Sequence, residues 1–192
     1  MTHYEQLYSI AADNYGIVTS AQAKGMGISD KEMSAIAARG RIRRLGRGVY
    51  KIVDYIPVEN DPYAEAVALV GDGAYLYGES VLGLLRLMPT NPTRIFIASP
   101  KRVRRHLPGN IRLKRAPSGQ VPTEYDGVPS QTVADAIKSC VGCVMGERLC
   151  DAIEEAARQG FLDKAEKDDL TGVAVGIVFA AGDDAVVRVY LI

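Results

Sequence analysis

The sequence contains no tryptophan, only three phenylalanines and two histidines, so its ten tyrosines carry most of the aromatic bulk. Three cysteines in 192 residues do not make a disulfide framework, and they fit a reducing compartment. The longest apolar run, Val173–Ala181, is far shorter than the ~18 residues that a membrane span needs. The first residues lack the basic stretch and apolar run of a signal peptide. We therefore expect a cytoplasmic protein without a membrane partner.

Cys140 and Cys143 form a C-x-x-C pattern, which invites a zinc or a redox interpretation. Zinc needs about four ligands, and neither His3 nor His106 lies at the spacing of a ligand pair. A thioredoxin-like motif opens a helix after a strand, whereas this pattern falls where a helix is expected to end. We therefore expect buried or half-buried thiols, no metal site and no cofactor.

Acidic and basic residues balance overall, with 23 of each, but they are unevenly distributed. Residues 1–57 carry eight Lys and Arg against five acids, and residues 93–117 carry eight against none. The intervening residues 58–92 hold one base and five acids, and residues 118–192 hold six bases and thirteen acids. Association with a polyanion depends on local charge, so the zero total does not exclude a nucleic-acid partner.

The first 57 residues show an ordered series of short elements. Ser29 and Glu32 form a capping box at the start of the third helix, and Gly46-Arg47-Gly48 joins two strands as a hairpin. This order is typical of a winged helix-turn-helix, and we predict such a DNA-binding domain over residues 1–57. The expected elements are helices at His3–Asn14, Ala21–Lys24 and from Ser29, and strands at 17–18, Arg41–Leu45 and Val49–Ile52.

Residues 58–192 are expected to form a second, mixed α/β domain, which makes the fold class α/β (α+β). The last 21 residues suggest two strands about Gly182-Asp183-Asp184. The other expected helices are Tyr63–Val70, Ser80–Leu87, Gln131–Cys140 and Glu147–Gln159, and the other expected strands are Ala74–Tyr77, Arg94–Ala98 and Ile111–Arg115.

The third helix and the hairpin, or wing, carry the predicted DNA contacts. Small residues on the outer face of the helix would let its backbone approach the bases, and the wing packs six cations into thirteen residues with no acid. The alternative for such a run is a solvated surface. The predicted contacts are Lys31, Ser34 and Ala35 to the major groove, and Arg39, Arg41, Arg43, Arg44, Arg47 and Lys51 to phosphate or minor groove.

A second basic block lies between two expected strands, in Ser99-Pro-Lys-Arg-Val-Arg-Arg-His106. Its cations Lys101, Arg102, Arg104 and Arg105 are candidates for a second contact with a DNA backbone or with RNA. The alternative is a solubilising loop that faces acidic residues of the C-terminal helices, such as Asp151, Glu154 and Glu155.

The sequence offers no catalytic residue that we would name. The strands Arg94–Ala98 and Ile111–Arg115 contain no acid, whereas metal-dependent cleavage needs acids converging at a strand end. Glu79 and Asp126 stand alone, and no phosphate-binding or nucleophile-elbow motif is present. We expect a protein that is not an enzyme. The alternatives are a nuclease-like enzyme with a winged-helix targeting domain, or an RNA-binding adaptor acting through residues 101–105.

Several motifs together resemble a known family. They are Tyr15-Gly-Ile-Val-Thr19, Arg39-Gly-Arg-Ile-Arg-Arg-Leu-Gly-Arg-Gly-Val-Tyr50, Tyr77-Gly-Glu-Ser-Val-Leu-Gly-Leu-Leu85, Arg94-Ile-Phe-Ile-Ala98 and Gly127-Val-Pro-Ser-Gln-Thr-Val-Ala-Asp-Ala-Ile137. Over residues 4–160 the chain resembles AbiEi-type antitoxins of bacterial abortive-infection (type IV) toxin–antitoxin systems. The tail from Gly172 does not match the family pattern.

The resemblance implies a transcriptional repressor of its own operon that binds inverted repeats in double-stranded DNA. It also implies an antitoxin role against a nucleotidyltransferase-like toxin, without a stable complex between the two. Binding to inverted repeats would require either a homodimer or two monomers placed cooperatively.

Overall fold

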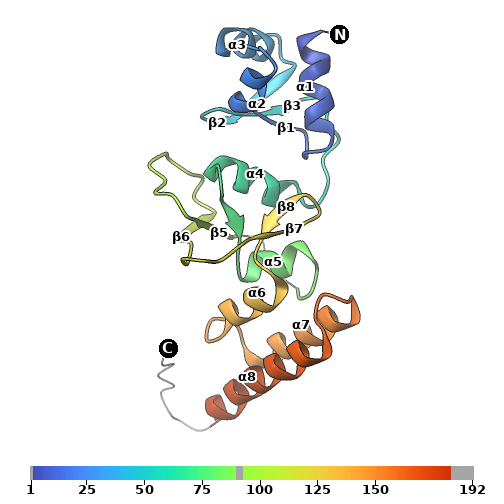
Figure 1. Ribbon diagram of the computed structural model, residues 1–192, viewed down its shortest axis with the longest axis vertical. Helices are drawn as coiled ribbons and strands as arrows, with labels where there is room; N and C mark the ends of the chain where they lie inside the picture. The colour runs from blue at the N-terminus through green and yellow to red at the C-terminus, as the bar shows by residue number, and fades with distance from the viewer. Residues whose placement is uncertain (1, 90–92, 183–192) are drawn as a thin grey trace.

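A computed structural model describes residues 2–89 and 93–182, and for residues 175–182 it gives the backbone alone. Its helices and strands form two groups, each built around its own sheet, along an elongated molecule (Figure 1). The N-terminal group lies at one end, the second sheet lies in the middle, and two C-terminal helices form the other end. Within the described residues, no helix is both long and apolar enough to cross a membrane.

The N-terminal group has the element order of a winged helix-turn-helix. β3 is the central strand of its antiparallel sheet, in the order β1-β3-β2, and β2 and β3 form the wing hairpin. The helices are α1 His3–Ala12, α2 Ser20–Gly25 and α3 Asp30–Ala38, and the strands are β1 Ile17–Thr19, β2 Ile42–Gly46 and β3 Val49–Ile52.

Each helix of this group begins with a capping box, in which a Thr or Ser side chain and a side chain three residues later satisfy two backbone amides. Ser29 and Glu32 do so at α3, as predicted. The pairs Thr2 with Glu5 and Thr19 with Gln22 cap α1 and α2. The three helix starts are therefore specified locally by the sequence.

A small apolar core holds the three helices against the sheet. Met33 and Ile36 of α3 are buried with Leu7 of α1, and Tyr50 of β3 lies in the same core. Because α3 turns these residues inward, its opposite face is left exposed to solvent.

The second group is mixed α/β, in agreement with the predicted fold class. Its sheet has the order β6-β5-β4-β8-β7, in which β5–β6 and β4–β8 are parallel and the other pairs are antiparallel. The strands are β4 Tyr75–Leu76, β5 Ile95–Ser99, β6 Ile111–Arg115, β7 Thr123–Tyr125 and β8 Val128–Ser130. The helices are α4 Asp61–Val70, α5 Glu79–Leu84, α6 Val133–Cys140, α7 Gly146–Arg158 and α8 Lys164–Gly182.

The β7–β8 hairpin has no counterpart among the elements expected from the sequence. Its turn is Asp126-Gly127, where both residues have positive φ, 49° and 72°. Asp-Gly is among the strongest sequence signals for a two-residue hairpin turn, so this element could have been found. The flanking strands have three residues each, too few to show a clear alternation.

The prediction of two strands in the tail was wrong for its first strand. Residues up to Gly182 belong to the 19-residue helix α8, and the predicted second strand lies outside the described residues. Leu170 and Ala174 of α8 are buried, and Lys167 pairs with Glu154 of α7 at 2.7 Å. A short apolar run does not distinguish a strand from a buried helix, and packing against α7 decides between them.

The two groups contact each other through buried residues. Ile17 of β1 and Val49 of β3 belong to the larger core, together with residues of α4 and the second sheet. The Tyr15 hydroxyl donates to the backbone carbonyl of Asp126 in the β7–β8 turn. The predicted domain boundary after residue 57 falls in the segment between β3 and α4, and it stays a prediction.

Candidate nucleic-acid interface

The outer face of α3 presents all of the helix residues that were predicted to face DNA. Lys31, Ser34, Ala35 and Arg39 are exposed, while Met33 and Ile36 anchor the opposite face. The Ser34 hydroxyl donates to the backbone carbonyl of Asp30 at 2.8 Å, so this side chain lies back along the helix. The centre of the face therefore carries only the small side chains of Ser34 and Ala35, and the cations Lys31 and Arg39 lie at its two ends.

The wing presents Arg43, Arg44 and Arg47 to solvent. Ile42, which precedes the first two, turns into the core and is 2% exposed. The pairing of β2 with β3 shifts register between Arg44 and Gly46, and the Arg44 Nε donates to the Gly46 carbonyl at 3.1 Å. The register shift leaves Leu45 without a partner in the pairing of β2 with β3.

Arg41 lies just before β2, and its guanidinium is directed toward α1. It stands 4.7 Å from the centre of the Tyr4 ring, and its Nη1 lies 3.5 Å from Asp54 Oδ2. The Tyr4 hydroxyl donates to the same carboxylate at 3.0 Å. Arg41 therefore belongs to the side of the winged helix between α1 and α3.

The prediction that Lys51 contacts DNA phosphate is contradicted by its position. Its Nζ lies 2.5 Å from Asp61 Oδ2 and 2.6 Å from Glu65 Oε1, both on α4. The Lys51 and Asp61 side chains are each 7% exposed. Burial lowers the pKa of Lys51, but hydrogen bonds to the two carboxylates outweigh it and leave the pKa above its ordinary value.

The reason for this error lies in the place of β3 in the sheet. β3 is the central strand, and all four of its residues are buried. The acids that compensate Lys51 come from α4, ten and fourteen residues later in the chain. The wing sequence alone contains no acid, so it gives no sign of this pairing.

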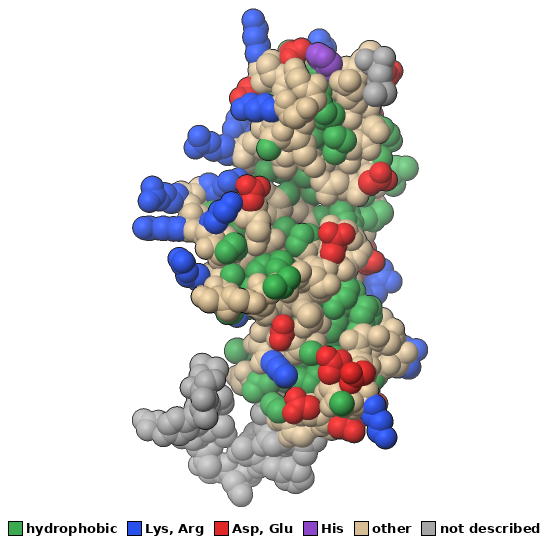
Figure 2. All heavy atoms as spheres, in the orientation of Figure 1, with side chains coloured by type: hydrophobic (Ala, Val, Ile, Leu, Met, Phe, Trp, Pro, Cys, Tyr) green, Lys and Arg blue, Asp and Glu red, His purple; other side chains and the backbone are tan. Residues whose placement is uncertain are grey.

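The second basic block lies beside the wing. Lys101, Arg102, Arg104 and Arg105 are all exposed on the segment between β5 and β6. The Arg105 Nη1 lies 3.5 Å from the backbone carbonyl of Arg47 at the wing tip and 3.3 Å from that of Leu69 on α4. In Figure 2, basic side chains project from one side of the molecule along the wing and this segment.

We refer to these exposed cations as the basic edge; they are Arg43, Arg44, Arg47, Lys101, Arg102, Arg104 and Arg105. Among described residues, one close acid is Asp72, 3.7 Å from Lys101, with both side chains largely exposed. Glu154 and Glu155, two of the acids named in the solubilising alternative, pair with Lys167 and Arg158 near the other end of the molecule. The structure thus brings together two basic blocks that meet at Arg47 and Arg105, which are 58 residues apart in sequence.

The winged helix is the part of the chain that matches a known family. Residues 5–53 match the family model described as "Transcriptional regulator, AbiEi antitoxin". The match runs from α1 to just past the end of β3, so it covers the winged helix. No curated protein matches the chain.

The match confirms the predicted resemblance to AbiEi antitoxin regulators over the winged helix. A transcriptional regulator family fits a segment that exposes small residues and cations on α3 and arginines on the wing. The rest of the resemblance, over residues 54–160, stays a prediction.

Outside this AbiEi-like segment, Glu79 and Asp126, the two acids considered for catalysis, lie on different elements. Asp126 accepts a hydrogen bond from Asn60 at 3.2 Å in the β7–β8 turn, whereas Glu79 lies in the first turn of α5. In the part of the chain that the structure describes, no three His, Cys, Asp or Glu residues gather as metal ligands would. Burial raises the pKa of the Cys140 thiol to about 12, and Cys143 is exposed.

Proposed function

We propose that this chain is a DNA-binding autorepressor and the antitoxin of a bacterial type IV toxin–antitoxin system. The regulator family matched by residues 5–53 supports a role in transcription. The exposed face of α3, with Lys31, Ser34, Ala35 and Arg39, would enter the major groove of the operator.

The observation that carries this proposal is the basic edge. Seven exposed cations from the wing and the β5–β6 segment lie on one side, with Arg105 bridging the two parts. A duplex carries a phosphate charge at every ~1.7 Å of its axis, so such an edge releases counterions on binding. We infer that both parts of the molecule contact the same duplex, the wing near α3 and residues 101–105 farther along the backbone.

The remaining features of the proposal come from the family resemblance. The operator would consist of inverted repeats, bound by a homodimer or by two cooperative monomers. The opposing toxin would be nucleotidyltransferase-like and would be neutralised without a stable complex. We propose that the chain acts in the cytoplasm, needs no cofactor or metal and catalyses no reaction.

The proposal is tested by titrating the full chain against DNA from upstream of its own gene, with random DNA as the control. Binding should prefer the upstream DNA and weaken steeply with salt. The double variant Arg43→Ala/Arg47→Ala should reduce the slope of log K against log salt by about two, or roughly 0.9 for each phosphate contact. Equal affinity for random DNA, or an unchanged slope in the double variant, would refute the repressor function.

The proposal that the chain is not an enzyme has its own test. Purified protein would be incubated with DNA and with RNA in the presence of Mg²⁺ or Mn²⁺. We expect no cleavage or modification. Activity that is lost in Glu79→Gln or Asp126→Asn would instead support the nuclease-like alternative.

A further inference from the structure

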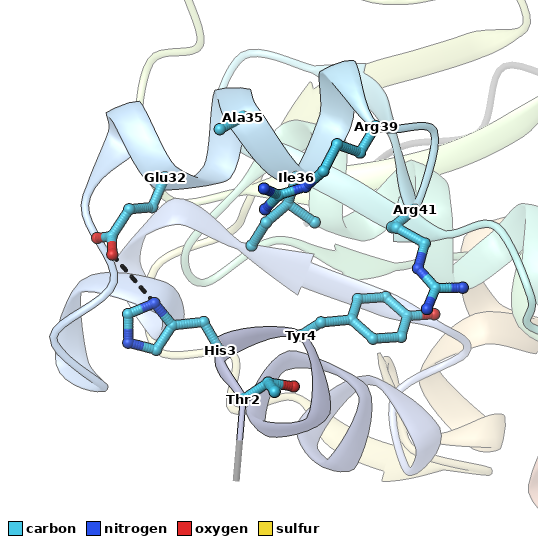
Figure 3. A pocket seen from close by; sticks show the side chains of 8 residues that line it. All are labelled: Thr2, His3, Tyr4, Glu32, Ala35, Ile36, Arg39 and Arg41. Carbon is cyan, nitrogen blue, oxygen red and sulfur yellow. Dashed lines mark ion pairs between the residues drawn. The ribbon is translucent and has the colours of Figure 1, made fainter.

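A groove of about 660 Å³ separates the N-terminal end of α1 from the flank of α3. Figure 3 shows its walls: Thr2, His3 and Tyr4 come from α1 and its cap, and Ala35 and Arg39 come from α3 and its C-terminal end. The lining also includes Glu32, Ile36 and Arg41. The groove shares Ala35 and Arg39 with the α3 face proposed to contact DNA, whereas α1 is not part of that proposed surface.

The acids around the groove are already paired within the protein. Glu32 accepts hydrogen bonds from the Ser29 amide and hydroxyl, which lower its pKa, and it lies 3.0 Å from His3 Nδ1. Asp54 accepts from the Tyr4 hydroxyl and lies beside Arg41. Both carboxylates are thus hydrogen-bonded to side chains of the protein, and neither lies within ion-pair distance of Arg39.

Arg39, in contrast, has no acidic partner among the described residues within ion-pair distance. Its guanidinium extends over the groove in Figure 3, on the opposite side from Tyr4. A guanidinium has five N–H donors, and its planar fork matches the geometry of phosphate oxygens. The Arg39 guanidinium therefore offers N–H donors to the groove, and the Arg41 guanidinium lies close by over the Tyr4 ring.

The position of the groove indicates which anion would reach it. A helix with its side chains is about 10–12 Å across, and the major groove of B-DNA is about 12 Å wide. A helix in that groove therefore has a phosphate backbone along each flank. The groove lies along one edge of the exposed α3 face, at Ala35 and Arg39, next to Lys31 and Ser34 on the same face.

We propose that the groove between α1 and α3 seats one phosphodiester segment of the bound duplex, with Arg39 as its main donor. This inference rests on the proposed DNA-binding function and adds α1 to the interface. The side chains of Thr2 and Ala35, which line the groove, are small and leave room for the sugar–phosphate chain. A phosphate contact here fixes the position of α3 in the major groove and does not read sequence.

The decisive variant is Thr2→Asp. Asp is as good an N-cap as Thr, so α1 should stay capped while a carboxylate enters the mouth of the groove. Thr132→Asp is the matched control, because Thr132 is an exposed N-cap of α6 in the second group and gives the same change in charge. A second variant, Arg39→Gln, removes the proposed donor.

The measurements are the affinity of the full chain for duplex DNA over a salt series and an ethylation-interference map of the phosphates. We expect Thr2→Asp and Arg39→Gln each to lower the salt slope by about one and to lose interference at the same phosphate. Thr132→Asp should match the wild type in both measurements.

The outcomes separate this inference from the proposed function. If the wild type binds DNA and Thr2→Asp behaves like Thr132→Asp, the groove is not a phosphate seat and the repressor proposal is unaffected. The groove is likewise excluded as a phosphate seat if Thr2→Asp and Arg39→Gln remove interference at different phosphates. If the wild type shows no preference or salt dependence for DNA, both proposals fail together.

Discussion

At the scale of single residues, Lys51 shows how burial changes the role of a cation. An exposed lysine in the wing would be one more phosphate contact. In the structure its charge is shared with Asp61 and Glu65 between β3 and α4. Removing one partner from a buried ion pair leaves an uncompensated charge, so Lys51 should matter for stability and not for DNA binding.

We expect Lys51→Met to lower the free energy of unfolding by about 3 kcal/mol, because Asp61 would stay buried without its cation. Urea denaturation followed by circular dichroism measures this change. Lys101→Ala is the control, since its pair with Asp72 is exposed and should be worth less than about 1 kcal/mol. A similar, small effect of both variants would show that the cluster contributes little.

The same cluster predicts a pH dependence of stability. The folded-state pKa of Lys51 is raised, so its stabilising contribution is complete below the ordinary lysine pKa of about 10.4 and is lost as pH rises through the folded-state value. The stability difference between wild type and Lys51→Met should thus stay constant from about pH 6 to 9 and shrink above about 10.4. Unfolding curves across this range, with both proteins in the same buffers, test it. A difference that grows in alkali contradicts the assigned ion pairs.

At the scale of elements, the start of α3 depends on one local motif. The Ser29 hydroxyl accepts from the Glu32 amide at 3.3 Å, and Glu32 Oε2 accepts from the Ser29 amide at 2.8 Å. Both bonds satisfy donors that the first turn would otherwise leave free. The element that carries the predicted base contacts is therefore fixed at its beginning by residues that do not themselves need to touch DNA.

We expect Ser29→Ala to cost about 1 kcal/mol of stability, because the cap is lost. Ser34→Ala is the matched control on the same helix. Ser34 is exposed to solvent in the middle of α3, where alanine is the better helix former. It should be neutral or stabilise the protein by up to about 0.5 kcal/mol. Thermal and urea unfolding of the two variants side by side distinguish a capping effect from a general effect of removing a hydroxyl. Equal losses would argue against the capping box.

At the scale of the whole molecule, charge is separated along the long axis. The basic edge spans the winged helix and the middle of the molecule (Figure 2). Near the other end, α7 and α8 carry seven acids and four bases. The Arg105 guanidinium bonds to the carbonyls of Arg47 and Leu69, which connects the second basic block to the wing and to α4. A duplex that contacts both the wing and the second basic block would therefore lie along the line that joins them.

We expect the triple variant Lys101→Ala/Arg102→Ala/Arg104→Ala to weaken binding to all duplexes alike and to lower the salt slope by up to about three. Preference for upstream over random DNA should persist, because phosphate contacts carry no sequence information. The control is Lys138→Ala/Arg158→Ala/Lys164→Ala, which removes the same charge from α6, α7 and α8. If the two triple variants lose affinity equally, net charge and not the basic edge governs binding.

The sequence by itself determined the winged helix and most of the second group's elements. Its information there is local: capping boxes span four residues, Ile42 alternates with exposed arginines, and glycines lie at the wing turn. The motifs that resemble AbiEi antitoxins were also recognisable, and the match over residues 5–53 confirms that part. The exposed face of α3 followed from the same periodicity.

Only the tertiary structure decided which cations face solvent together. Lys51 meets carboxylates ten and fourteen residues away, and Arg105 meets the wing tip across 58 residues. It also decided that residues 172–182 continue helix α8, because the packing of α8 against α7 selects one of two structures that the apolar run allows. Contacts between distant segments depend on how the two sheets pack, and neither composition nor periodicity within a segment encodes that packing.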